Sequence, residues 1–163
     1  MPGVHLTFLE TSKFKTSLMS AAFVRPLDAE EASKNALLPA VLLRGSREYP
    51  DMESLSAAMD ELYGAGFSDI SAKKEESQLV GLAASVIDDR YAPGEDLKNR
   101  TAKLLGGLLL DSAMEKGLFR GDYVGSEKAN LLDAIEGQIN DKRRYSLLRL
   151  VEEMCPGERY AVS

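Results

Sequence analysis

The chain has 163 residues, of which 44% are hydrophobic and 28% are charged, and this composition predicts one globular domain with a sizeable core. Its 26 acidic residues outnumber its 20 basic ones, and the net charge of -6 argues against binding to nucleic acid or to an anionic membrane. No apolar run is long enough to span a bilayer, and residues 1–4 lack the pattern of a signal peptide, so we expect a cytoplasmic location.

The first half of the chain contains the patterns of two strands and two helices. Residues 4–9 and 15–25 are typical of strands, and we expect them to pair antiparallel. Asp28 opens a sequence like a capping box, which predicts a helix over about residues 29–43. Apolar residues spaced by three and four predict a second helix over residues 52–62.

The second half of the chain contains a hairpin pattern followed by helices. Residues 67–73 and 78–87 flank a charged turn and predict two antiparallel strands. A third helix is expected over about residues 97–114, and a long fourth helix begins near Asp122. The fourth helix continues after the polar stretch 140–144, which is either a basic recognition patch or, as we favour, a solvated helical face.

Together these elements predict the fold class but not the function. Their order is strand, strand, helix, helix, strand, strand, helix, helix. This order predicts an α+β domain with a mainly antiparallel sheet of about four or more strands and with helices packed on one face. A fold of this kind hosts many unrelated activities, so it does not identify the chemistry.

The chain has one histidine and one cysteine, and this scarcity limits its chemistry. Cys155 alone cannot form an intrachain disulfide or a thiolate zinc cluster. His5 alone cannot form a two-histidine metal site within one copy. We expect His5 on the polar face of the strand over residues 4–9, and not in the role of a ligand or a general base.

The stretch NALLPAVLLRGSREYP, residues 35–50, carries a proline inside a predicted helix, although an interior proline costs a helix about 3 kcal/mol. Its flanks resemble the pitrilysin/insulinase family of zinc metallopeptidases, the inverzincins. Members of that family carry H-x-x-E-H on a helix, followed by an apolar pair, a basic-Gly-Ser/Thr step and a Tyr/Phe-Pro exit. Residues 42–46 and 49–50 match these flanks in order and spacing.

The resemblance implies that the zinc site of the family is missing. Counting back from Gly45, the first histidine of the motif falls on Ala36, its glutamate on Pro39 and its second histidine on Ala40. Aligning a later helix places the third zinc ligand on Ala134. None of these side chains offers a donor atom, so the resemblance implies no metal, no cofactor and no catalytic residue. An empty site has less need of a straight helix, which would explain why Pro39 is tolerated.

Four further segments narrow the resemblance to one bacterial branch, whose members are the zinc-less subunits of paired peptidases. These segments are residues 14–16, 36–39, 60–65 and 148–155. Members of the family are longer and contain two similar α+β halves. The resemblance therefore implies that residues 1–163 form a single domain, most of the N-terminal domain of a two-half protein.

Two function classes follow from the resemblance. The first is a non-catalytic subunit that binds peptide or unfolded polypeptide and pairs with an active zinc peptidase homologue carrying H-x-x-E-H. The second is a stand-alone peptide-binding or scaffolding module without a proteolytic partner. In either class an extended peptide can add to an edge of the sheet through main-chain hydrogen bonds. The sequence argues against an independent zinc peptidase, because the catalytic motif is absent.

Overall fold

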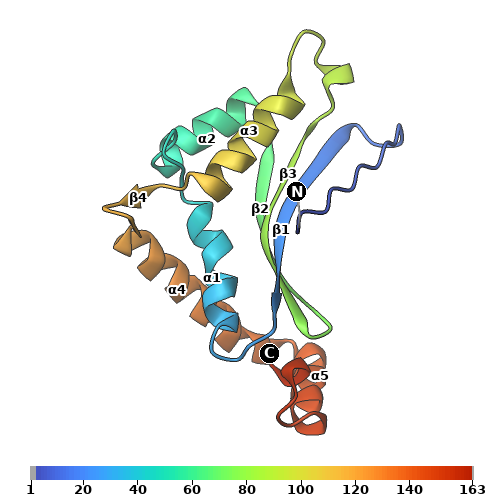
Figure 1. The fold of residues 1–163 in the computed structure, drawn as a ribbon, viewed down its shortest axis with the longest axis vertical. Coiled ribbons are helices and arrows are strands. Elements are labelled where there is room, and N and C mark those ends of the chain that lie inside the picture. Colours follow the sequence, from blue (N-terminus) through green and yellow to red (C-terminus); the bar gives the residue numbers. More distant parts are fainter. Residues whose placement is uncertain (1–2, 163) are drawn as a thin grey trace.

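A computed structural model describes residues 3–162 and shows an α+β fold, which confirms the predicted fold class (Figure 1). The larger elements are the strands β1 (Thr16–Pro26), β2 (Gly66–Lys74) and β3 (Ser77–Ile87) and the helices α1 (Ala32–Leu42), α2 (Met52–Glu61), α3 (Leu97–Leu110), α4 (Gly121–Gly137) and α5 (Lys142–Met154). The smaller elements are the strands β4 (Met114–Glu115) and β5 (Leu118–Phe119) and the 3-10 helices η1 (Asp89–Tyr91), η2 (Gln138–Asn140) and η3 (Arg159–Ala161). No helix within residues 3–162 combines the length and the apolar character needed to cross a membrane.

The main sheet is antiparallel and has β3 at its centre, in the order β1-β3-β2. Residues 16–26 of β1 pair with residues 77–87 of β3. On the other side, residues 66–74 of β2 pair with residues 77–85 of β3, so the predicted hairpin is confirmed. Strands β1 and β2 each have one edge that is not paired within the described part of the chain.

Helices cover one face of this sheet, and the core lies between the two layers (Figure 1). Successive side chains of a strand point to opposite faces, and alternate residues of β3 from Val80 to Val86 are buried under the helices. Helices α1 and α3 contact β3, and α1 also contacts β2. The largest fully buried side chains come from the sheet and from two helices: Leu55, Leu82, Leu97 and Leu108.

The predicted N-terminal strand is wrong, because residues 4–9 do not form one. The chain before β1 is bound to the loop that follows β3, where Asp88 N donates a hydrogen bond to Lys15 O at 2.8 Å. Residues 4–9 pair with no strand, and Leu6 is 93% exposed. The main sheet accordingly has three strands and not four or more. His5 is exposed and lies on no strand face.

The helix predictions are confirmed for α1, α2 and α3, with corrected ends. Helix α3 ends at Leu110, because the chain then turns into the β4–β5 hairpin. Lys116 and Gly117 at its tip have φ angles of 53° and 78°, which suits a tight two-residue turn. The predicted long fourth helix is broken between α4 and α5. Asp141 begins a new helix there, and its side chain accepts a hydrogen bond from Arg144 N at 3.0 Å.

Candidate functional site

Helix α1 carries three of the four predicted site positions, and side chains fix its beginning. Asp28 Oδ1 accepts hydrogen bonds from Glu30 N and Glu31 N, at 2.9 and 3.3 Å, in the turn that precedes α1. The predicted capping box at Asp28 is wrong, because the N-cap of α1 is Glu31 and its side chain makes no cap hydrogen bond. The buried Gln78 of β3 donates from Nε2 to Ala32 O at 2.9 Å and accepts from Asn35 Nδ2 at 3.2 Å. These contacts hold the first turn of α1 against the beginning of the central strand β3.

The predicted motif positions lie together on α1, and Pro39 differs from the others in its burial. The Pro39 ring is fully buried, whereas Ala36 and Ala40 are half-buried. Because Pro39 has no N–H group, the carbonyl of Asn35 loses its usual intrahelical hydrogen bond. The helix continues, since Leu43 N donates to Pro39 O at 3.1 Å. Burial of the apolar ring offsets part of the cost of the lost hydrogen bond.

Arg44, directly after α1, anchors α4 to the rest of the domain. Its Nε donates to Glu127 Oε1 at 2.5 Å, and its Nη2 donates to Ser126 Oγ at 3.1 Å. The side chains of Arg44 and Glu127 are 26% and 14% exposed, so the ion pair is partly shielded from water. The guanidinium also lies 5.8 Å from the centre of the Tyr123 ring. The basic residue of the basic-Gly-Ser step is thus a structural anchor here.

The fourth predicted site position, Ala134, lies on α4, the helix that Arg44 anchors. Helix α4 packs against α1 and runs in the opposite direction (Figure 1). Ala134 follows Glu127 by two turns, which is about 10 Å along α4. The side chain of Ala134 is exposed. Within residues 3–162, no group of three histidine, cysteine, aspartate or glutamate side chains is placed to hold a metal ion.

Replacing Arg44 with alanine should lower the free energy of unfolding by about 2 kcal/mol, because Glu127 would keep a partly shielded charge without its partner. Hydrogen exchange of α4 should rise at the same time. The matched control is Arg47→Ala, since Arg47 is 81% exposed and its ion pair with Asp111 should contribute at most about 1 kcal/mol. Urea denaturation of both variants measures the difference. Equal losses in the two variants would contradict the assigned anchor.

The turn after α1 folds tightly, and this explains the residues that follow Arg44. The buried Ser46 accepts a hydrogen bond at Oγ from Tyr49 N at 3.1 Å, and its own N–H donates to Tyr49 O at 2.8 Å. A Cβ atom at Gly45 would lie 2.7 Å from Tyr49 O, so the turn needs glycine. The Gly-Ser and Tyr-Pro steps of the sequence therefore belong to one compact turn.

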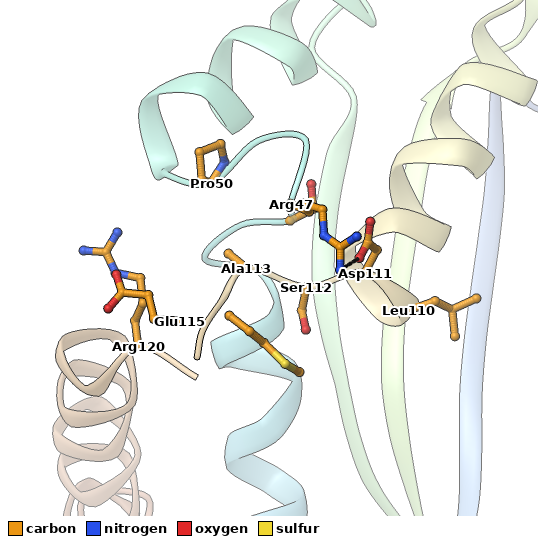
Figure 2. A pocket seen from close by; sticks show the side chains of 10 residues that line it. Arg47, Pro50, Leu110, Asp111, Ser112, Ala113, Glu115 and Arg120 are labelled. Atoms are coloured by element: carbon orange, nitrogen blue, oxygen red, sulfur yellow. Dashed lines mark ion pairs between the residues drawn. The ribbon is translucent and has the colours of Figure 1, made fainter. Parts of the chain in front are cut away.

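A pocket of about 300 Å³ lies beside this turn and was not predicted from the sequence. Ser46 and Ser112, which both line the pocket, form an antiparallel bridge. Figure 2 shows the Arg47–Asp111 ion pair, at 3.0 Å, on one side of the pocket and Arg120 on the other. The lining mixes charges of both signs with apolar groups, so it favours no single ligand class.

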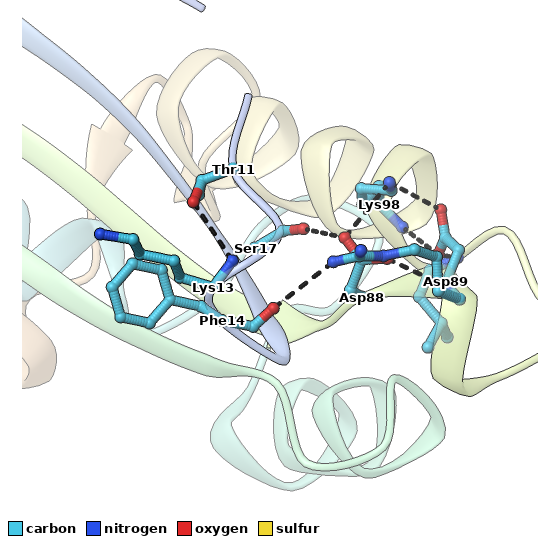
Figure 3. Close-up of polar contacts among 9 residues, drawn as sticks. Thr11, Lys13, Phe14, Ser17, Asp88, Asp89 and Lys98 are labelled. Carbon is cyan, nitrogen blue, oxygen red and sulfur yellow. Dashed lines mark hydrogen bonds and ion pairs between the residues drawn. The ribbon is translucent and has the colours of Figure 1, made fainter. Parts of the chain in front are cut away.

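A second polar cluster joins the starts of β1 and α3 (Figure 3). Asp88 accepts hydrogen bonds from Arg90 Nε at 2.8 Å and from Ser17 Oγ at 3.1 Å. Asp89 Oδ1 accepts from Leu97 N at 3.0 Å and so binds the first turn of α3. The hydrogen bonds from Arg90 hold the pKa of Asp88 far below its ordinary value. All of these contacts link parts of the fold, and none of the side chains in this cluster lines the pocket beside Ser46.

Replacing Asp88 with asparagine should lower the thermal midpoint at neutral pH, because the ionised carboxylate is the form that Arg90 and Ser17 bind. A lowered pKa in the folded state stabilises the protein above the unfolded pKa of about 3.9. The stability difference between the wild type and Asp88→Asn should therefore shrink as the pH falls below about 4. Asp69→Asn, which changes an exposed carboxylate on β2, is the control. A gap that persists unchanged in acid would contradict this assignment.

The structure is an α+β fold in which the partly buried helix α1 carries alanine and proline, and no donor side chain, at the three positions that the sequence analysis assigned to a zinc motif. No model of a known protein family matches the chain. The chain is 35% identical over 161 residues to the protein named probable inactive metalloprotease YmfF of Bacillus subtilis (strain 168). This similarity covers 98% of the chain and 38% of that protein.

The fold also matches a solved structure, that of a conserved protein from Enterococcus faecalis V583. The TM-score is 0.81 at 25% identity, over 91% of this chain and 36% of that one. The chain thus spans less than half the length of either protein. Along nearly its whole length it is similar to a metalloprotease-like protein that is named as inactive.

Proposed function

We propose that this chain belongs to a zinc-less, peptidase-like subunit of the pitrilysin/insulinase type, which binds peptide and pairs with an active homologue. The observation that carries the proposal is α1, a helix that holds Ala36, Pro39 and Ala40, the residues predicted for the motif positions, in a chain similar to YmfF. Two imidazoles and a carboxylate at those positions would bind zinc and activate its water. Two methyl groups and a proline ring leave only binding surface. The greater length of both relatives supports a longer protein, and the family resemblance places residues 1–163 in the N-terminal domain of its two halves.

The edge of β2 is the favoured place for peptide. It is the outer strand on the side of the sheet that α1 contacts, and its outward N–H and C=O groups are unpaired within the described residues. An extended peptide that adds to this edge gains main-chain hydrogen bonds with little sequence preference. Such binding suits a subunit that receives varied or unfolded polypeptides.

Proline substitutions in β2 can test its outer edge apart from the edge that pairs with β3. Neighbouring strand residues point their N–H groups in opposite directions, so only one of Ser68→Pro and Asp69→Pro removes an outward donor. The other breaks the pairing with β3 and should lower the thermal midpoint. The variant that keeps its stability should lose affinity for an unfolded model peptide, as measured by fluorescence anisotropy. Full affinity in that variant would exclude strand addition at β2.

Pairing with an active homologue needs its own test. Mixing the purified chain with a homologue from the same organism that carries H-x-x-E-H should give a one-to-one complex, measured by light scattering. The chain without a metal has binding surface to offer and no chemistry of its own. If no mixed complex forms while peptide still binds, the stand-alone peptide-binding module is the better function.

A further inference from the structure

The second half of β2 is polar on the side of the sheet that faces the helices. Residues directly opposite each other in an antiparallel pair point to the same face. Three polar residues of β2 lie opposite residues of β3 that are buried on the helix side: Asp69, Ser71 and Lys73. All three are exposed, so they lie at the open rim beside the core. Side chains on a helix-covered face are usually apolar, and packing therefore does not explain this polar row.

The polar row carries one charge of each sign, and neither charge is paired with another within the described residues. Asp69 takes part in none of the ion pairs among residues 3–162. The Lys73 ammonium group donates to Tyr160 O at 2.8 Å and to Val162 O at 3.1 Å. These carbonyls hold the ammonium group in place without neutralising its charge. Asp69 and Lys73 are four residues apart, about 14 Å along the strand, which is too far for a mutual ion pair.

The main-chain edge next to this row is open within the described part of the chain. None of the backbone hydrogen bonds among residues 3–162 joins residues 155–162 to β2, although Lys73 contacts that segment. Every pairing in the main sheet is antiparallel, and antiparallel pairing is slightly the more stable kind. An added peptide strand is therefore expected to run antiparallel to β2. A peptide side chain opposite Asp69 or Lys73 would then have its Cβ about 5 Å away, where unlike charges attract and like charges repel.

We propose that the β2 edge selects extended peptides in which an acidic residue is followed four positions later by a basic residue. Because the peptide runs opposite to β2, its acidic residue lies opposite Lys73 and its basic residue lies opposite Asp69. A peptide with the reverse order places like charges at both positions. The net charge of -6 attracts any basic peptide, but only a strand in fixed register distinguishes the two orders. The inference rests on the proposed binding of peptide at β2 and names the class of peptide that is bound there.

Two fluorescein-labelled peptides of the same composition test the proposal. Each carries one glutamate and one lysine four residues apart in an otherwise uncharged sequence with blocked ends, and only the order of the two differs. Fluorescence anisotropy with the full chain should give a dissociation constant about fivefold lower for the peptide with glutamate first, since both cross-strand pairs change from like to unlike charges. The ratio of the two constants should approach one in 1 M salt, where the Debye length is about 3 Å. A preference for lysine first at low salt would overturn the proposal.

Charge exchange on β2 tests whether Asp69 and Lys73 set the preference. The variant with both Asp69→Lys and Lys73→Asp keeps the net charge and should prefer the peptide with lysine first by a similar factor. Lys74→Asp is the matched control, because Lys74 lies opposite Ser77 and points to the other face, so this variant should keep the wild-type preference. A preference that is unchanged by the exchange would overturn the roles of Asp69 and Lys73.

Two negative results separate this inference from the proposed function. If both peptides bind equally and the stable proline variant of β2 loses affinity for both, strand addition holds and the selection by charge is wrong. If neither peptide binds to the wild-type chain, the proposed peptide binding at β2 is wrong, and the selection by charge is overturned with it.

Discussion

Replacing Gly81 with alanine should lower the free energy of unfolding by about 3 kcal/mol, at the upper end of the range for overpacking. Gly81 is buried in β3, where β1 passes very close to it. A Cβ atom at this position would lie 2.0 Å from Ala21 O and 2.6 Å from Ala22 Cα. Backbone atoms cannot rotate away as a side chain can, so the pairing of β1 with β3 must open. Urea denaturation measures the loss, and hydrogen exchange should show it first in β1.

Gly125→Ala is the matched control for Gly81→Ala. Gly125 lies in α4, and a Cβ atom there would meet nothing within 4 Å. Alanine favours a helix over glycine by about 1 kcal/mol, so this variant should be neutral or more stable than the wild type. If both variants lost the same stability, the close approach of β1 to β3 would not be the cause.

The parts of the fold that the sequence predicted are those fixed by local patterns. Apolar spacings marked α2 and α3, and the charged turn between two apolar runs marked the β2–β3 hairpin. Residues 4–9 show why alternation alone is insufficient. Their pattern is that of a strand, but β1 pairs with residues 77–87, which are distant in sequence. A strand needs a partner, and the choice of partner depends on tertiary contacts that no local pattern records.

In the candidate site, too, some features follow from local sequence patterns and others depend on tertiary contacts. The helix predicted over about residues 29–43 was enough to place Ala36, Pro39 and Ala40 on one helix. The role of Arg44 could not be predicted, because its partner Glu127 is 83 residues away in the sequence. The burial of Pro39 and the pocket beside Ser46 likewise depend on how α1 packs against the sheet and α4. The assignment of Ala134 to the third ligand stays a prediction, and it can be tested by rebuilding the site.

Introducing Ala36→His and Ala40→His should create a weak zinc site on α1, with a dissociation constant in the micromolar range. Residues four apart share one helical face, so both imidazoles can reach one ion. Pro39 is left unchanged, because a carboxylate at this fully buried position would lose its hydration. Zinc titration by calorimetry at fixed pH measures the affinity. The single variants should bind much more weakly, since one imidazole provides one donor.

Adding Ala134→Glu to the two histidine substitutions should tighten zinc binding by about tenfold or more, because a third protein donor completes an open zinc site. The matched control is Ala129→Glu in the same background. Ala129 is also exposed on α4, but it lies five residues before Ala134 and points to a different side of the helix. Equal affinity with both glutamates would reject Ala134 as the third-ligand position while leaving the reading of α1 intact. No binding by any variant would mean that the face of α1 carrying Ala36 and Ala40 is closed to a metal ion, and the alignment with the zinc motif would then be wrong.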